Sequence, residues 1–198
     1  PAAPAGAAIV GPGGALYVAS ERGEVSRYDL LTGHWVWSRG LDASAARLVH
    51  ADGDRVVALR EDGMMIALSP RDGEPLWTSR IALRGEGFQD HIVADGLLLA
   101  WIGAQPTRLI RQGGGWAVAQ LGQSKIRALE LATGDGPWDP VTVPTPGGYF
   151  VPGALARAGP VILCPVASPQ GMIRVSSIRI RDGVRKADAI IRHQTGQW

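Results

Sequence analysis

Short apolar runs alternate with turn residues along almost the whole chain. Runs of four or five apolar residues, such as VVAL at 56–59 and LLLAW at 97–101, are bounded by glycine, aspartate and proline. Runs of this length are typical of β-strands, and the Gly and Asp residues between them are typical of hairpin turns. The pattern therefore predicts an all-β protein of short antiparallel strands, with no helix longer than about two turns.

The strand pattern is repeated along the sequence. Its clearest mark is a turn glycine followed four residues later by a tryptophan. In the first three copies these pairs are Gly33 and Trp37, Gly73 and Trp77, and Gly134 and Trp138. The second pair comes 40 residues after the first, and the third comes 61 residues after the second. A weaker fourth copy has Asp182-Gly183, with Ala187 in the place of the tryptophan. Four strand signals at a period of about 40 residues predict a β-propeller, or part of one, of about four blades, each a four-stranded antiparallel sheet.

The motif around each tryptophan resembles that of a known repeat family. RYDLLTGHWVW, ALSPRDGEPLW and ALELATGDGPW are similar to the tryptophan-docking motif of PQQ-like β-propeller repeats. The resemblance covers nearly the whole chain and is weaker in the last copy. It implies that Trp37, Trp77 and Trp138 each bury a large ring against the neighbouring blade. The matching turn glycines would then adopt a positive φ, which a Cβ disfavours.

The resemblance also divides the chain. An Ala/Pro-rich linker is expected at 1–7 and blades over 8–198, with approximate blade boundaries at 8–41, 42–83, 89–144 and 153–198. Family members usually carry seven or eight blades, so four imply a small ring, an incomplete arc or pairing with another chain. Because the chain begins with Pro1 and its TGQW ending looks like the start of another motif, we expect an excerpt of a longer ring.

A second tryptophan lies beside the first docking residue. Trp35 is two residues before Trp37, so both rings would share one face of a regular strand. A bulge after the turn would separate them. We expect Trp35 to pack against the next strand, and the alternative is a contact with a partner.

The third repeat is 21 residues longer than the others and contains a candidate partner-binding hairpin at 104–123. TRLIRQ and WAVAQL flank three consecutive glycines, which predicts an added β-hairpin with a flexible tip. Its apolar residues, including Trp116, are too numerous for a free solvent loop, and Arg108 and Arg111 add charge typical of interfaces. The alternative is a hairpin that folds back on its own blade.

Charge is unevenly distributed. Residues 1–99 hold nine arginines and thirteen acidic residues, a net charge of −4, whereas residues 100–198 hold eleven basic and five acidic residues, a net charge of +6. This asymmetry is too mild to imply nucleic acid. Near the end, Arg179 and Arg181 alternate with isoleucines, and Arg185 follows; they form either a solvated outer face or a patch for an acidic partner.

Catalytic signatures are missing from the sequence. Cys164 is the single cysteine, which excludes an intrachain disulfide and a CxxC pair. Quinoprotein dehydrogenases of the similar family hold pyrroloquinoline quinone and Ca²⁺, and many use a disulfide of adjacent cysteines that Cys164 alone cannot form. No P-loop, GxSxG or HExxH motif occurs, and the acidic pair of Asp52 and Asp54 is more typical of a turn than of a calcium site. We therefore predict no catalytic, cofactor-binding or metal residues.

The resemblance, together with these missing signatures, implies a non-catalytic, bacterial propeller scaffold similar to those of outer-membrane assembly. Its expected partners are other protein subunits or the remaining blades of a longer chain, with no nucleic acid and no membrane span. The alternatives are a fragment of a PQQ-dependent dehydrogenase and a sensor domain of a signalling or envelope protein. The resemblance favours a periplasmic or extracytoplasmic location, while the N-terminal proline leaves the cytoplasm open.

Overall fold

The computed structural model describes most of the chain. The described residues are 8–42, 45–83, 86–104, 107–112, 115–121, 123–145, 149–168 and 172–192. The predicted linker at 1–7 and the TGQW ending lie outside them. The helical content of the described part is one 3₁₀ turn, Pro12–Gly14, and every other regular element is a strand. The all-β prediction is therefore confirmed.

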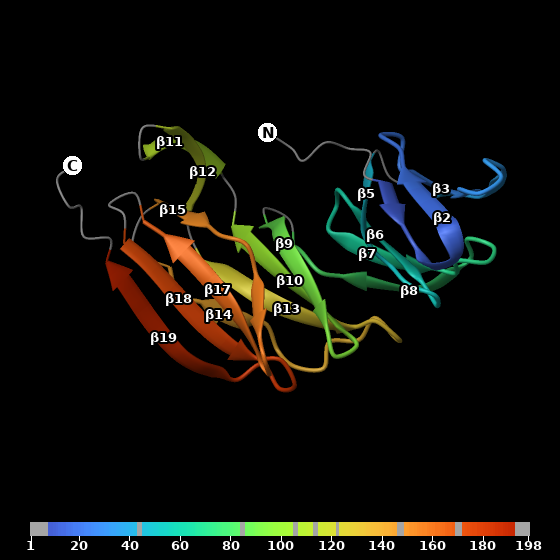
Figure 1. The fold of residues 1–198 in the computed structure, drawn as a ribbon. Coiled ribbons are helices and arrows are strands. Elements are labelled where there is room, and N and C mark those ends of the chain that lie inside the picture. Colours follow the sequence, from blue (N-terminus) through green and yellow to red (C-terminus); the bar gives the residue numbers. More distant parts are fainter. Residues whose placement is uncertain are drawn as a thin grey trace. The chain divides into compact units, whose positions relative to one another are not determined.

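The chain forms two compact units, Pro1–Arg84 and Gly85–Trp198. The first unit contains two four-stranded antiparallel sheets, drawn in blue and in teal to green (Figure 1). The strands of the first sheet are, in order, β1 (Ala8–Val10), β2 (Ala15–Ala19), β3 (Glu24–Asp29) and β4 (Trp35–Gly40). Those of the second are β5 (Ala46–Ala51), β6 (Val56–Arg60), β7 (Met64–Leu68) and β8 (Pro75–Arg80).

The second unit contains the third and fourth sheets. The third sheet is built from β9 (Glu86–Ala94), β10 (Leu97–Ala104), β13 (Ser124–Glu130) and β14 (Val141–Val143), in the order β14-β13-β10-β9. The fourth contains β15 (Tyr149–Pro152), β16 (Ala156–Ala158), β17 (Val161–Ala167), β18 (Met172–Arg179) and β19 (Arg185–Arg192). Both β15 and β16 pair with β17, so two short segments share the place of one strand.

The extra residues of the third repeat form a hairpin of β11 (Thr107–Gln112) and β12 (Gly115–Leu121). The hairpin is joined to the fourth sheet rather than to the sheet of its own repeat. Gln120 and Leu121 of β12 pair with Phe150 and Tyr149 of β15. The hydrogen-bonded fourth sheet therefore has seven strands, instead of the four that the repeat alone predicts.

Each unit is held together by an apolar core shared by its two sheets. In the first unit Tyr17 and Val25 of one sheet and Val56 and Leu68 of the other belong to one buried cluster. In the second unit the corresponding cluster includes five fully buried residues, Trp101, Ile126, Phe150, Ile162 and Ile178. Burial of these faces is the main favourable contribution to stacking two sheets.

Candidate functional site

The repeated tryptophan joins neighbouring sheets. In the first unit the Trp37 ring on β4 lies against Gly73 in the last turn of the second sheet. A Cβ placed on Gly73 would be 2.7 Å from Cε3 of Trp37. The Trp37 Nε1–H donates a hydrogen bond of 3.0 Å to the Pro70 carbonyl, and the side chain is buried. The indole therefore uses its flat face and its polar edge on the same turn.

The second unit repeats this contact with Trp138 and Gly183. A Cβ on Gly183 would be 2.7 Å from Cδ2 of Trp138, and the indole Nε1–H donates to the Ile180 carbonyl at 3.1 Å. Both acceptor carbonyls therefore lie three residues before the covered glycine. Trp138 itself precedes the short outer strand β14, which begins at Val141.

The turn that contains the repeated glycine has one conformation in all four sheets. The turn glycines have positive φ, with values of 73° at Gly33, 75° at Gly73, 78° at Gly134 and 68° at Gly183. Each glycine N–H donates to the carbonyl four residues earlier, at 2.7 to 3.0 Å; these acceptors are Asp29, Ser69, Glu130 and Arg179. A left-handed residue costs glycine little, which explains why glycine recurs at this position.

Trp77 occupies the place on β8 that Trp37 has on β4. Trp37 pairs with Arg27 of the preceding strand and Trp77 with Ala67, which is 40 residues after Arg27. Trp77 is 9% exposed. The two tryptophans that the sequence repeat aligns therefore occupy equivalent positions on the outer strands of the two sheets.

Trp35 does not pack as we expected from the sequence. The register between β3 and β4 shifts after Arg27, so that Tyr28 pairs with Trp35 and Val36 is the extra residue of a bulge. The bulge separates the two tryptophans, because it interrupts the alternation of faces. Trp35 is 60% exposed. The structure therefore corrects the expectation that Trp35 packs against the next strand.

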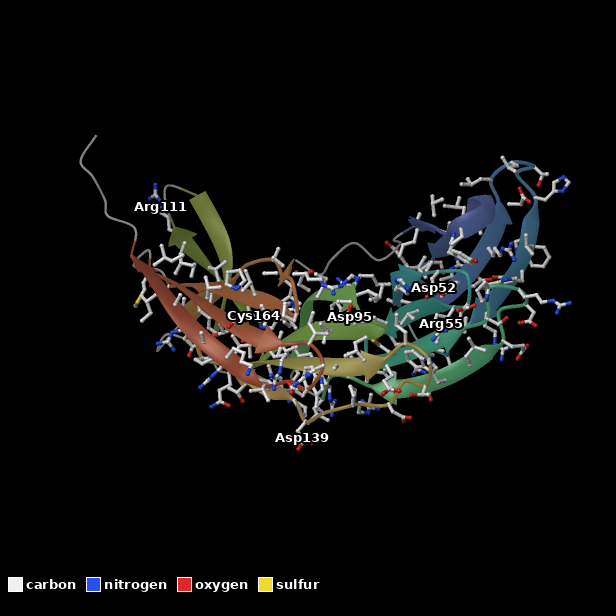
Figure 2. The ribbon with its side chains drawn as sticks, turned by 60° about the horizontal axis from the view of Figure 1, so that its bottom comes forward. Asp52, Arg55, Asp95, Arg111, Asp139 and Cys164 are labelled. Carbon is white, nitrogen blue, oxygen red and sulfur yellow. The ribbon has the colours of Figure 1, made fainter. Side chains whose placement is uncertain are left out.

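The partner-binding residues predicted on the hairpin are placed in part. Arg111 is exposed near the tip of β11 (Figure 2). The side chains of Arg108 and Trp116 lie outside the described part. The backbone register places Arg111 opposite Trp116 and Arg108 opposite Ala119.

The arginines near the end of the chain differ in their surroundings. The Arg179 Nε–H donates to Oδ1 of Asp182 at 2.7 Å, and its Nη2 contacts Oδ2 of the same carboxylate. The hydrogen bonds from Arg179 lower the pKa of Asp182 to about 2. Arg179 therefore braces the turn that receives Trp138, a role that its spacing from Asp182 permits and that we did not predict. Arg181 and Arg185 remain more exposed, with 78% and 46% of their side chains accessible.

The acidic pair of Asp52 and Asp54 lies in the turn between β5 and β6 of the second sheet. Oδ1 of Asp52 accepts hydrogen bonds from the backbone N–H groups of Asp54 and Arg55, both at 2.8 Å, and Oδ2 lies 3.0 Å from Nε2 of His50. Asp52 and Arg55 are labelled in Figure 2. Within the described residues, no group of three or more His, Cys, Asp or Glu side chains is arranged to hold a metal ion.

Cys164 lies on β17 in the core of the second unit (Figure 2). Its side chain is fully buried, and burial raises the pKa of the thiol to about 12. The described part also contains no helix of the length and apolarity needed to cross a membrane.

Comparison with known proteins identifies the family. A family model described as outer membrane protein assembly factor BamB matches residues 2–190. The chain belongs to the BamB family. A curated BamB family member, the outer membrane protein assembly factor BamB of Burkholderia pseudomallei (strain K96243), is 29% identical over 175 residues. That alignment covers 85% of this chain and 44% of the relative, so the chain spans less than half of the relative's length.

Solved structures support the fold. A quinohemoprotein alcohol dehydrogenase from Comamonas testosteroni superimposes with a TM-score of 0.59 at 15% identity, over 89% of this chain and 33% of the enzyme. A europium-containing methanol dehydrogenase gives a TM-score of 0.59 at 15% identity, over 87% of this chain and 39% of the enzyme. At this identity the likeness concerns the propeller fold that the BamB family shares with these enzymes.

Proposed function

We propose that this chain is part of a non-catalytic propeller scaffold that binds other protein subunits in outer-membrane protein assembly, outside the cytoplasm. The observation that carries the proposal is the match of residues 2–190 to the BamB family. The Trp37 and Trp138 contacts support it, because they fix neighbouring sheets firmly and leave loops and edges to bind partners.

The hairpin of β11 and β12 is the proposed main contact with a partner. It meets the fourth sheet through two residue pairs, Gln120 with Phe150 and Leu121 with Tyr149. From Gly115 to Ala119, β12 pairs with β11 alone among the described strands, and β11 ends the sheet order. Most of the hairpin therefore extends beyond the strands β15 to β19, with the exposed Arg111 near its tip.

Arg181 and Arg185 are proposed to add positive charge to the surface that partners meet. Both are more exposed than Arg179, and their ion pairs, from Arg181 to Asp182 at 3.5 Å and from Arg185 to Asp188 at 3.9 Å, are longer than that of Arg179 with Asp182. Interfacial arginines contribute strongly to binding because their planar donors match carboxylates. An acidic patch on a protein partner is the chemistry that these side chains fit.

The proposal is tested by deleting residues 108–119 and joining the ends with a short glycine linker. We expect the deletion to abolish capture of partner proteins from the native source while the melting temperature changes little. A matched pair of point variants, Arg111→Glu on the hairpin and Arg71→Glu on the exposed turn of the second sheet, separates the local effect from net charge. Retained capture together with a large fall in melting temperature would show that the hairpin is structural.

A further inference from the structure

The connection from β3 to β4 and the start of β4, residues 30–36, form an exposed apolar segment. Leu31 is 88% exposed and Trp35 60%, and the side chains of Leu30 and Val36 are exposed as well. The sequence of the apolar segment, LLTGHWV, contains no Asp, Glu, Lys or Arg. Exposed apolar groups of this kind mark sites that another macromolecule or a membrane covers. The apolar segment is therefore a candidate contact surface.

The equivalent turns of the second and fourth sheets carry charged side chains instead. The residue two positions before the turn glycine is Leu31 in the first sheet, Arg71 in the second and Arg181 in the fourth. Two positions after the glycine, the first sheet has Trp35 and the fourth has Arg185. The turn glycines share one backbone conformation, so the turn itself does not require apolar side chains at 31 and 35.

Contact between neighbouring sheets does not cover the position of Leu31. Arg71 and Arg181 occupy that position in turns whose glycines lie against Trp37 and Trp138, and both arginines remain exposed. A neighbouring sheet that packed in the same way against the first sheet would therefore leave Leu31 exposed. Its burial requires a different kind of contact.

Every backbone N–H group from residue 29 to residue 34 donates a hydrogen bond within the first sheet. The main acceptor is Asp29, whose Oδ1 accepts from the N–H groups of Leu31 and Thr32 at 2.8 and 3.0 Å. The remaining bonds run from the N–H groups of Asp29, Leu30, Gly33 and His34 to the carbonyls of His34 (2.9 Å), Gly14 (2.8 Å) and Asp29 (2.7 Å) and to Oγ1 of Thr32 (3.3 Å). The turn can therefore enter a water-poor environment without leaving an N–H group unpaired.

A second uncharged turn adjoins the apolar segment. It is the 3₁₀ turn between β1 and β2, and residues 8–20, which include it, contain no Asp, Glu, Lys or Arg. The Leu30 N–H donates to the Gly14 carbonyl of this turn, and Cγ of Leu31 lies 3.7 Å from the Cβ position of Gly14. Val10, the last residue of β1, is 63% exposed. The uncharged surface of the first sheet therefore extends over both turns.

We propose that the apolar segment binds a lipid bilayer by inserting Leu31 and Trp35 into its interfacial region. Tryptophan is enriched at membrane interfaces because its ring is amphipathic, and exposed leucines gain from the acyl boundary. The interfacial region still contains water and headgroups, which satisfy outward carbonyls. The inference goes beyond the proposed function, and rests on it only in placing the chain beside a membrane.

Two observations favour a bilayer over a protein partner. Protein interfaces surround their apolar centre with polar and charged side chains, whereas the apolar segment has no charged residue. The N–H groups of the turn are already paired, so they are not available to an incoming polypeptide strand. The match to a family described as an outer membrane protein assembly factor agrees with a position near a membrane.

Vesicle binding of the 198-residue chain tests the proposal. We expect the chain to sediment with phosphatidylcholine vesicles equally at low and high salt, because an uncharged segment binds through apolar area. The double variant Leu31→Arg with Trp35→Ser should weaken binding roughly tenfold or more, because it removes two large apolar side chains. Its melting temperature should change little, since both side chains are exposed. A chain that stays in the supernatant, or that binds only at low salt, would overturn the proposal.

The matched control removes two exposed apolar side chains outside the apolar segment. Leu76 on β8 and Leu83 after it are 52% and 55% exposed. We expect Leu76→Ser with Leu83→Ser to bind vesicles as the wild type does. A loss equal to that of the Leu31 and Trp35 variant would show that binding follows total apolar exposure, and would overturn the assignment to the apolar segment.

A polarity-sensitive fluorophore measures insertion directly. Thr32→Cys and Asp72→Cys place the label one residue before the turn glycine in the first and second sheets, and Cys164 is buried. We expect vesicles to shift the emission of the label at 32 to shorter wavelength, and nitroxide-labelled lipid to quench it, with neither change at 72. The same response at both positions would overturn the proposal. No response at 32 would also overturn it, and would leave the segment to a protein contact.

Failure of this proposal and failure of the scaffold proposal are distinguishable. The vesicle measurements contain no partner protein, so their outcome does not depend on partner capture. The deletion of residues 108–119, which tests the scaffold proposal, leaves the apolar segment in place. We therefore expect the deleted chain to bind vesicles as the intact chain does; loss of vesicle binding in this variant would contradict the assignment to the first sheet.

Discussion

The indole of Trp37 lies so close over Gly73 that a Cβ on this glycine would be 2.7 Å from the ring. Its N–H binds the Pro70 carbonyl of the same turn. Trp138 and Gly183 repeat the arrangement in the second unit, with Ile180 as the acceptor. The repeated sequence motif therefore corresponds to a repeated contact between sheets, in which the tryptophan ring leaves no room for a Cβ on the turn glycine.

We predict that Trp37→Ala destabilises the chain by about 3 to 5 kcal/mol, the range for removing a large buried aromatic side chain. Trp77→Ala should fall in the same range, since Trp77 is 9% exposed. Trp35→Ala is the matched control, because this ring is 60% exposed and should cost less than about 0.5 kcal/mol. Urea unfolding of the three variants measures these differences, and equal losses at 35 and 37 would refute the assigned packing.

Trp37→Phe isolates the polar edge of the indole. Phenylalanine retains an aromatic face over Gly73 and cannot donate to the Pro70 carbonyl. We predict a loss of roughly 1 to 3 kcal/mol, because the variant removes both a hydrogen bond and part of a buried ring. Its free energy of unfolding should lie between those of the wild type and Trp37→Ala; a value as low as that of Trp37→Ala would assign the whole effect to the hydrogen bond and its geometry.

The fold class followed from the spacing of the strand and turn signals, and the positive φ of the turn glycines followed from the resemblance of the tryptophan motifs to a known repeat family. The separation of Trp35 from Trp37 did not follow, since the bulge at Val36 depends on how β3 and β4 pair. The seven-stranded sheet was also missed. Leu121 pairs with Tyr149 although β13 and β14 of the third sheet lie between them in the sequence, and such a long-range pairing leaves no local pattern.

Among the candidate site residues, the role of Arg179 rests on its contact with Asp182, which the alternation of arginines and isoleucines along the strand does not reveal. The pattern placed Ile178 and Ile180 in the core, and the structure buries both. It did not show that Arg179 closes on Asp182 within the receiving turn. A basic residue three positions before an aspartate in a tight turn is the signal that would have indicated this pair.

We predict that the turn of the fourth sheet weakens in acid. The hydrogen bonds from Arg179 hold the pKa of Asp182 at about 2, below its ordinary value of 3.8. A carboxylate whose pKa is lowered by folding stabilises the folded state fully at a pH above its ordinary pKa of 3.8, and this stabilisation is lost as the pH falls through about 2. The melting temperature of Asp182→Asn should therefore fall less between pH 5 and pH 2 than that of the wild type. Asp139→Asn, at an exposed loop residue, is the control and should follow the wild type.

We predict that Cys164 does not react in the folded chain. The thiol is fully buried, and burial raises its pKa to about 12, so neither access nor thiolate is available near neutral pH. A colorimetric thiol reagent at pH 8 should report no reaction before unfolding and one thiol per chain in denaturant. Rapid modification without loss of folded signal would contradict the packing of β17.

The central claim is that this chain binds other proteins and does not catalyse a quinone-dependent oxidation. A photo-crosslinking amino acid at residue 111, with residue 71 as the control position, tests it in the native source. We predict crosslinks from 111 to a protein of outer-membrane assembly, none of these from 71, and no quinone absorbance in the purified protein. A bound quinone with calcium, together with the same crosslinking pattern from both positions, would contradict the claim.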